Sequence, residues 1–272
     1  MKIRGELKQL VEEKIMQSWS PEQISGRLQR ERNLAVSAET IYQPIIRDDR
    51  AGGLLRYGQR KRRRQHPWLT KLKTAERPRE RERHIDNRPE TANKRLEPGH
   101  WERDCVIGAR GKSALLVAVD RYSRYVRISR VGATTIRAVG KETIRMLDGL
   151  PIASMTNDNG HEFGGASELE PKLGARIYVC DPSSPWQRGT VENTNGLIRQ
   201  YLPKQTNFDS IHPSLPLALE ETLNHRPKKV LGFRTPHEVL FDEKTNLFSK
   251  TKKLHFGLES AVERLLIWIY NY

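Results

Sequence analysis

A continuous apolar run at residues 113–119 restricts the possible folds of this chain more than any other feature. Its sequence is Ser-Ala-Leu-Leu-Val-Ala-Val, without the polar alternation of a strand that has one face in water. A short run of this kind is typical of a β-strand buried on both faces. It therefore predicts a sheet with helices packed on both of its sides.

Turn and alternation signals place two further strands beside this run. Residues 101–107 alternate and lead into a hairpin turn at 108–111, and a second turn at 120–124 leads into a strand at 125–131. The three strands are predicted to be antiparallel neighbours.

The next part of the chain changes between helix and strand patterns. The predicted elements are a helix at 134–147, a strand at 152–156, a helix or loop at 162–173, a strand at 176–180, and a helix that begins at Pro185 with Ser184 as its cap. Three antiparallel strands followed by this alternation indicate an α/β fold with a mixed sheet flanked by helices.

Residues 1–46 show helical spacing of apolar side chains and two helix starts. Ser20-Pro21-Glu22-Gln23 is a capping-box start, and Ser37 is predicted to cap a short helix at 38–46. Two short helices joined by about six residues resemble a helix-turn-helix, whose second helix enters the DNA major groove. The residues expected to reach bases or phosphates are Glu39, Thr40 and Gln43. The alternative is a small helical bundle that docks against the rest of the chain.

The charge of the chain is strongly basic and unevenly distributed. A net charge of +15 indicates a polyanionic partner, with nucleic acid as the first candidate and an acidic membrane surface as the alternative. Residues 47–95 hold 17 Lys and Arg against 7 Asp and Glu, which is +10 of that charge. The densest block consists of Arg60, Lys61, Arg62, Arg63 and Arg64. This stretch is predicted to be a linker that contacts DNA phosphates, with a solubilising or targeting segment as the alternative.

Membrane and disulfide-rich classes do not fit the sequence. The longest apolar run, at 265–270, is far too short to cross a bilayer, and the N-terminus has no apolar segment of the signal-peptide type. Cys105 and Cys180 are too few for a disulfide framework and form no CxxC zinc pattern. The chain is therefore expected to work in a reducing compartment without a membrane partner.

Three carboxylates occupy positions where active sites form. Asp104 lies on the first predicted strand, Asp158 follows the fourth directly, and Glu192 lies on the helix after the fifth. Carboxylates that converge without a counter-ion repel one another, and a divalent metal removes that penalty. Oxygen ligands without Cys or His favour Mg²⁺ or Mn²⁺, and two such ions about 4 Å apart suit attack at phosphorus.

The helix that carries Glu192 shows a polar stripe at helical spacing. Its members, at steps of four, three and four, are Arg188, Glu192, Asn195 and Arg199. Arg188, Asn195 and Arg199 are predicted to contact DNA, with the two arginines holding phosphates beside the metal site. The alternative is an exposed helix face with an i,i+4 ion pair, which contributes little.

Several distinct short motifs are spread along the chain from about residue 19 to residue 240. They are Trp19-Ser20-Pro21-Glu22-Gln23-Ile24, Thr40-Ile41-Tyr42, Gly99-His100-Trp101-Glu102-Arg103-Asp104, Asn157-Asp158-Asn159-Gly160-His161-Glu162-Phe163, the stretch 186–200, Asn224-His225-Arg226-Pro227 and Thr235-Pro236-His237-Glu238. Asp158 and Glu192 are separated by 33 residues. Together these motifs resemble the DDE transposases of the insertion-sequence-thirty family, whose core has the RNase H-like fold of retroviral integrases.

The resemblance implies a transposase that cleaves DNA at the ends of an insertion sequence and transfers the 3′-OH into target DNA. Asp104, Asp158 and Glu192 would be the catalytic residues and would hold two Mg²⁺ or Mn²⁺ ions. DNA would be the partner, with a homo-oligomer in the active complex, in the bacterial cytoplasm at the nucleoid. The alternatives are a truncated, non-catalytic DNA-binding remnant that competes for element ends and a structure-selective nuclease of the same fold.

The expected organisation has four parts. These are a helix-turn-helix segment at 1–46, a basic linker at 47–96, an RNase H-like catalytic core at 97–241 and an atypical tail at 242–272. Family members usually carry a further helical DNA-binding segment before the Trp-Ser-Pro-Glu motif, which we expect to be absent or shortened here.

Several residues near the three carboxylates are expected to serve other purposes. Asp120 begins a turn, and Glu102, on the same strand face as Asp104, is a rival candidate for the site. The remaining expectations are a supporting or DNA-contacting role for His100 and His161, burial for Cys105, and burial in the core for Trp186, with base stacking as the alternative.

Overall fold

A computed structural model of the chain describes residues 3, 5–53, 55, 81–109 and 113–242. The chain divides into two compact units, one formed by residues 1–66 with 222–254 and the other by residues 67–221 with 255–272. In the described part of the chain, no helix combines the length and apolar character needed to cross a membrane. The basic block at 60–64 and most of the predicted tail lie outside the described residues.

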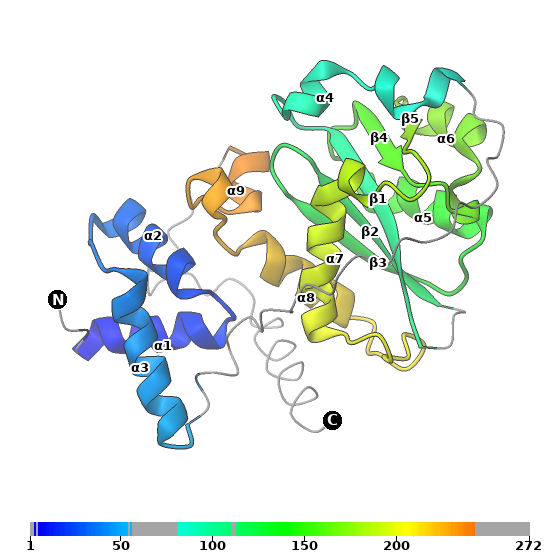
Figure 1. Ribbon diagram of the computed structural model, residues 1–272. Coiled ribbons are helices and arrows are strands. Elements are labelled where there is room, and N and C mark those ends of the chain that lie inside the picture. The colour runs from blue at the N-terminus through cyan, green and yellow to red at the C-terminus, as the bar shows by residue number, and fades with distance from the viewer. Residues whose placement is uncertain (1–2, 4, 54, 56–80, 110–112, 243–272) are drawn as a thin grey trace. The chain divides into compact units, whose positions relative to one another are not determined.

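The second unit is built on one five-stranded mixed sheet (Figure 1). Its strands are β1 His100–Ile107, β2 Ala114–Asp120, β3 Val126–Val131, β4 Ser154–Asn157 and β5 Arg176–Val179, in the order β3-β2-β1-β4-β5. β1 to β3 pair antiparallel, whereas β1 pairs with β4 and β4 with β5 in parallel. This confirms the predicted mixed sheet and the antiparallel order of its first three strands.

Burial of β2 confirms the prediction from the apolar run. All seven of its residues, including the terminal Asp120, are fully buried between two layers of helices. The helices of this unit are α4 Glu90–Lys94, α5 Ile136–Leu147, α6 Ala166–Leu173, α7 Gly189–Tyr201 and the start of α8 Leu215–Asn224.

Alternation along β1 shows that α5 and α7 cover opposite faces of the sheet. The Arg103 guanidinium donates a hydrogen bond to Thr143 Oγ1 of α5 at 2.5 Å. The neighbouring Glu102 and Asp104 instead accept hydrogen bonds from residues of α7. Because successive side chains of a strand point to opposite faces, two adjacent residues reach two different helices.

Residues 81–96 belong to the sheet unit, whereas the sequence analysis placed them in a linker. Two 3₁₀ turns, Arg81–Arg83 and Ile85–Asn87, precede α4 in this stretch. Arg83 forms an ion pair with Glu170 of α6 at 2.8 Å, and residue 84 forms a β-bridge with Val179 of β5. These contacts hold the stretch against the sheet, so the predicted linker boundary at 96 is corrected.

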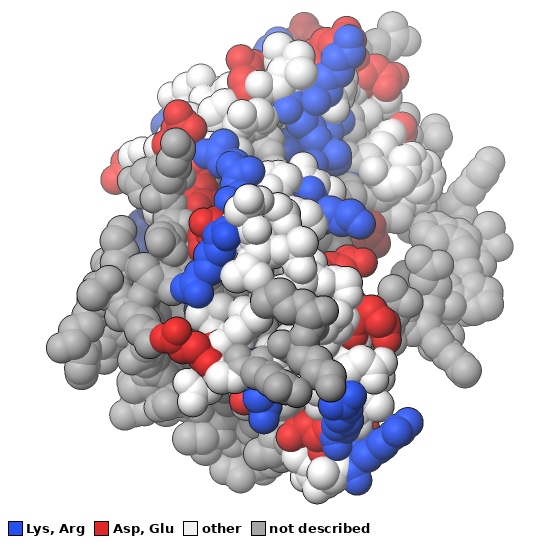
Figure 2. Space-filling model, turned by 90° about the vertical axis from the view of Figure 1, so that its left-hand side faces the viewer, with Lys and Arg blue, Asp and Glu red and all other residues white. Residues whose placement is uncertain are grey.

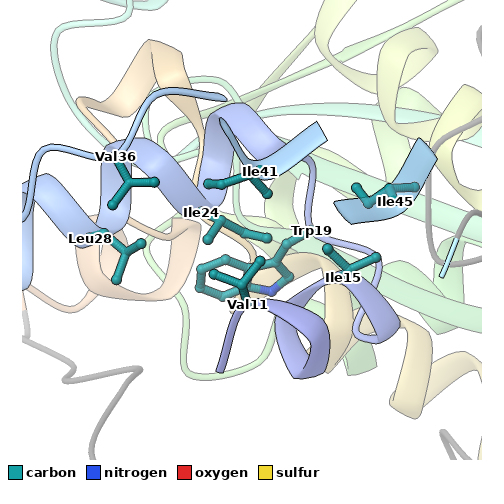
Figure 3. Packing of buried hydrophobic residues seen from close by; sticks show 8 residues of the cluster. All are labelled: Val11, Ile15, Trp19, Ile24, Leu28, Val36, Ile41 and Ile45. Atoms are coloured by element: carbon teal, nitrogen blue, oxygen red, sulfur yellow. The ribbon is translucent and has the colours of Figure 1, made fainter. Parts of the chain in front are cut away.

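The other unit is a bundle around α1 Gly5–Met16, α2 Pro21–Arg32 and α3 Ala38–Arg50. Its apolar core holds the Trp19 ring among aliphatic side chains of all three helices (Figure 3). The capping box of Ser20 and Gln23 and the Ser37 cap form as predicted. α3 continues four residues beyond the predicted end at 46, and residues 33–37 connect it to α2.

Residues 222–242 pack with this helical bundle, although the sequence analysis placed the chain up to 241 in the catalytic core. They contain a 3₁₀ turn, Lys229–Leu231, and the helix α9 Pro236–Leu240. Arg27 of α2 donates two hydrogen bonds to the buried carboxylate of Glu238, at 2.5 and 2.7 Å. A buried guanidinium needs such a partner, so the ion pair ties the two segments together.

Candidate active site

Asp104 lies on β1 and Asp158 directly follows β4, the parallel strand that pairs with β1. Glu102 of β1 is in register with Thr156 of β4, so continuing the register by two residues places Asp104 opposite Asp158. Asp104 accepts hydrogen bonds from the Cys105 amide and from Asn195 Nδ2 of α7, both at 2.8 Å. The parallel pairing of β1 and β4 thus brings together two residues that are 54 positions apart.

The guanidinium of Arg188 lies between these two carboxylates. It contacts Asp158 Oδ2 at 3.0 Å and Asp104 Oδ2 at 3.5 Å, and it donates to the Arg103 carbonyl at 3.3 Å. Burial alone would lower the pKa of Arg188, but the two aspartates raise it. A single buried cation therefore offsets the repulsion between the paired carboxylates.

The charged form of Asp104 remains unfavourable in spite of the nearby Arg188 cation. Burial and, more weakly, the charge of Asp158 raise its pKa to about 6, while Arg188 opposes the shift. Its carboxylate is mostly shielded from solvent, with 23% of the side chain exposed. A carboxylate held in such surroundings gains from a further positive charge nearby.

Glu102 anchors the helix that carries the third predicted carboxylate. Its Oε2 accepts hydrogen bonds from the backbone amides of Thr190 at 2.9 Å and Val191 at 2.8 Å, in the first turn of α7. Its Oε1 is paired with the buried Arg121 guanidinium. These amides have no partner within the helix, so a carboxylate from β1 stabilises the helix start.

The start of α7 differs from the prediction. Residues Pro185–Arg188 form a 3₁₀ turn, α7 begins at Gly189, and Ser184 makes no capping hydrogen bond through its side chain. Glu102 contacts the first amides of α7 from a distant part of the chain. Local sequence could not indicate this cap, because the acceptor lies 88 residues away.

Glu192 is exposed on the helix stripe that faces the two aspartates. Arg188 lies four residues before it and Asn195 three residues after it, and both contact Asp104. Asn195 and Glu192 are at a spacing that shares one side of α7, so Glu192 is on the side of the helix that contacts Asp104. Across the described residues, however, no three His, Cys, Asp or Glu side chains lie close enough to hold a metal ion.

The chemistry of the donors around Asp104 and Asp158 suits a hard divalent cation. The available groups are carboxylate and amide oxygens, which Mg²⁺ and Mn²⁺ prefer. Asn195 Oδ1 is buried and has no hydrogen-bond partner, although its Nδ2 donates to Asp104. A buried acceptor without a donor is unusual, and a cation or its bound water would satisfy it.

Arg199 and Trp186 lie in surroundings that differ from those predicted. Arg199 donates to the carbonyls of Ile107 at 2.6 Å and Pro203 at 3.2 Å, which ties the end of α7 to the end of β1. Its guanidinium therefore binds these backbone carbonyls, whereas it was predicted to hold a phosphate beside the metal site. Trp186 was expected in the core but is 69% exposed, because the 3₁₀ turn before α7 directs it outward.

The supporting residues around the site divide into buried and exposed groups. His100 is buried and bonds to Ser154 Oγ at 2.8 Å, and Asp120 accepts from Ser123 in its own turn and from the Gly99 amide before β1. Both therefore stabilise the fold. His161 is exposed, and Cys105 is only half-buried, whereas full burial was expected.

The residues predicted to read DNA lie together on the first half of α3. Glu39 and Gln43 are exposed and bonded to each other at 2.8 Å, and Thr40 shares a hydrogen bond with Ser37. They lie on the second helix of the predicted helix-turn-helix, at its outer surface. Their contact with DNA stays a prediction.

Two functional arrangements escaped the sequence analysis. The role of Glu102 was seen only as a rival to Asp104, and Arg121 was not singled out at all. Arg103 was also missed, although it is fully buried and bonds to Asn157 Oδ1 at 3.1 Å. Polar residues at consecutive positions of a buried strand are the available signal, because burial requires each to have a partner.

The strand order, the helices on both faces and the acidic residues on β1, after β4 and on α7 place the chain in the class of RNase H-like transposase and integrase cores. No protein-family model matches it. It is 38% identical over 253 residues to "Transposase InsI for insertion sequence element IS30A" of Escherichia coli K12, covering 86% of this chain. It is 40% identical to the transposase for element IS1086 of Cupriavidus metallidurans and 36% identical to that for element IS4351 of Bacteroides fragilis.

The chain belongs to the IS30 family of transposases. The alignments with the relatives from Cupriavidus metallidurans and Bacteroides fragilis cover 82% of this chain and 69% of each relative. The chain spans 64% of the length of the Escherichia coli relative. This confirms the family and the fold class expected from the motifs.

Proposed function

We propose that this protein is a DDE transposase that cleaves DNA at the ends of an insertion sequence and joins the freed 3′-OH to target DNA. The observation that carries the proposal is the aspartate pair on β1 and after β4, bridged by Arg188 and flanked by the Glu192 stripe. A carboxylate whose pKa is raised by burial and by a neighbouring like charge is a candidate for a catalytic or metal-binding group.

The residues that would hold two Mg²⁺ or Mn²⁺ ions are Asp104, Asp158 and Glu192. When bound, such ions activate water and neutralise charge at the phosphate. Asn195 would keep the Asp104 carboxylate oriented through its 2.8 Å hydrogen bond. Arg188, which already touches both aspartates, would hold them together and present positive charge to a phosphate oxygen.

Two further parts of the proposal concern the DNA. The first half of α3, with Glu39, Thr40 and Gln43, would read the element ends, and the basic block at 60–64 would contact phosphates. Because transposition brings two ends together, the active complex would be at least a dimer. A non-catalytic remnant would bind the ends without cutting them.

The test is incubation of the full chain with labelled DNA that contains the inverted repeats of its element, in Mg²⁺, in Mn²⁺ or in EDTA. We expect nicks at the ends and joined products with either metal but none in EDTA. The Asp158→Asn variant should bind the DNA and make neither product. Binding without nicks by the wild type would favour the remnant, and nicks without joining would favour a nuclease.

Replacing Gly160 by alanine is expected to reduce cleavage by about 10- to 100-fold, since small misplacements of reacting groups have effects of that size. A Cβ at this position would meet Glu162 Oε2 at 2.7 Å and Asp158 Oδ1 at 2.9 Å. Both carboxylates would have to move, and the Asp158 carboxylate is one of the two that contact Arg188. Initial rates of nicking in Mn²⁺ measure the effect.

Gly140→Ala in α5 is the matched control, because a Cβ there has nothing within 4 Å. It should leave cleavage unchanged and raise the free energy of unfolding by about 0.5–1 kcal/mol, the usual gain for a helical glycine. Equal cleavage by both alanine variants would contradict the role given to Gly160.

A further inference from the structure

Four guanidinium groups gather around the first turn of α7. Arg88 precedes α4, Arg95 ends it, and Arg121 and Arg124 lie at the turn between β2 and β3. Arg121 is paired with Glu102. Among the residues that the structure describes, Arg88, Arg95 and Arg124 form no ion pair with a carboxylate. The cluster therefore has more positive than negative charge.

Two of these guanidinium groups converge on one neutral hydroxyl. Thr190 Oγ1 accepts from Arg124 at 3.2 Å and from Arg95 at 3.5 Å. A hydroxyl offers lone pairs but no charge, so it does not offset two cations. The first amides of α7 are already bonded to Glu102, so the unmatched charge at this point is that of the two guanidinium groups. An anion placed there would offset the charges of Arg95 and Arg124.

The protonation behaviour of the cluster agrees with its lack of counter-ions. Burial, followed by repulsion from Arg121, lowers the pKa of Arg88 to about 10. Burial and repulsion from Arg95 lower that of Arg124 to about 10 as well, and the pKa of Arg95 is also lowered. These side chains stay charged at neutral pH, but their charged forms are less stable here than in water.

The backbone conformation of the two converging arginines is consistent with a ligand-binding role. Arg95 has φ of 57° and Arg124 has φ of 63°, both in the left-handed region. Glycine or asparagine occupies such positions at less cost, and strained positions of other residues cluster at ligand sites.

The cluster is open to solvent and close to the aspartate pair. Arg95 is exposed and Arg124 is half-buried. Figure 2 shows Lys and Arg side chains near the top of the face that it draws, with Asp and Glu side chains among them. Glu102, which anchors Thr190, lies two residues before Asp104 on the same face of β1, a separation of about 6.6 Å along a strand. One DNA strand can therefore extend past both places.

We propose that Arg95 and Arg124, with Thr190 between them, bind a backbone phosphate of the DNA strand whose neighbouring phosphodiester lies at the aspartate pair. This site deepens the proposed function and rests on it. Its ligand is a phosphodiester, which two guanidinium groups recognise by charge and geometry without reading the bases.

The test compares the wild-type chain with variants. For each, the affinity for a short labelled DNA duplex is measured by fluorescence anisotropy at several salt concentrations, without divalent metal. Log affinity falls with log salt by about 0.9 for each phosphate contact. The double variant Arg95→Asn/Arg124→Asn should lower that slope by about 1. The double variant Arg95→Lys/Arg124→Lys, which keeps both charges, should retain the slope. Asparagine tolerates positive φ, so the melting temperature of the first variant should not fall.

Arg137→Gln is the matched control for loss of charge, because Arg137 is exposed on α5 at the opposite face of the sheet. Its slope should equal that of the wild type. An unchanged slope in the asparagine double variant, with the wild type still binding, would overturn this site alone, whereas absence of binding by the wild type would overturn the proposed function.

Inorganic phosphate separates a DNA site from a site for a free anion. Melting temperatures are compared in phosphate and in chloride at equal ionic strength. If phosphate stabilises the wild type but not the asparagine double variant, and the DNA slope is unchanged, the pocket binds a free anion and the assignment to DNA is wrong.

Discussion

Replacing Asp104 by asparagine is expected to abolish strand cleavage and, at about pH 7.5, to raise the free energy of unfolding by about 2–3 kcal/mol. The second effect follows from the pKa of about 6, against an ordinary value of 3.8, because each pKa unit corresponds to about 1.4 kcal/mol. The fold favours the protonated form of this carboxyl group, and asparagine is a neutral group of the same shape.

The sign of the pH dependence follows from the direction of this shift. Between about pH 4 and pH 6 the folded protein holds a proton on Asp104 that the unfolded chain has released. The contribution of Asp104 to stability is thus fully present below pH 4 and is lost as the pH rises through 6. The Asp104→Asn variant has no carboxyl group at this position, so its stability does not fall in this pH range for this reason.

Urea unfolding in EDTA, at about pH 4.5 and pH 7.5, measures the difference between variant and wild type. The increase in the free energy of unfolding of the variant over the wild type should be small at about pH 4.5 and reach its full value at about pH 7.5. Asp148→Asn is the matched control, since Asp148 is exposed after α5, and it should change neither stability nor cleavage. A variant less stable than the wild type at pH 7.5 would contradict the electrostatic account of this site.

Replacing Glu102 by alanine is expected to lower the free energy of unfolding by about 3–5 kcal/mol, the usual effect of removing one partner of a buried ion pair. The side chain is fully buried, pairs with Arg121 and accepts from two amides of α7. Its removal leaves the Arg121 guanidinium buried without a counter-ion and the two helix amides without an acceptor. Chemical denaturation measures the loss.

A double-mutant cycle with Arg121→Ala isolates the pairwise part of this effect. The double variant should be less destabilised than the sum of the single variants, because no unpaired charge remains. Glu90→Ala serves as the control, since Glu90 forms an exposed pair with Lys94 that contributes at most about 1 kcal/mol. Simple additivity at Glu102 and Arg121 would show that the ion pair does not hold the start of α7.

Glu102 and Asp104 show how neighbouring acidic residues acquire different tasks. Both lie on the same face of β1 under α7. Glu102 accepts hydrogen bonds from two backbone amides and pairs with the Arg121 guanidinium. Its negative charge is therefore offset by these partners. Asp104 meets Asn195, the more distant Arg188 and the like charge of Asp158, so its charge is not matched. The unmatched carboxylate is the one able to gain from a metal.

Much of the fold could be predicted from local patterns. The apolar run at 113–119 indicated a strand buried on both faces, and turn residues on either side of it indicated antiparallel neighbours. The capping box at Ser20 located the start of α2, whereas the similar box at Thr235, which starts α9, was noted only as a family motif. Motifs and the spacing of Asp158 and Glu192 identified the family. Each of these signals depends on residues close in sequence, where side-chain periodicity and backbone preference operate directly.

Tertiary structure alone decided which distant groups meet. The register of β1 and β4 placed Asp104 opposite Asp158, and Arg188 then paired with both instead of with Glu192. The buried pair of Arg27 and Glu238 assigned residues 222–242 to the helical bundle. Every buried charge requires a partner, but a sequence names the candidates without their distances. Packing of the strands and helices determines which candidate is close enough to serve.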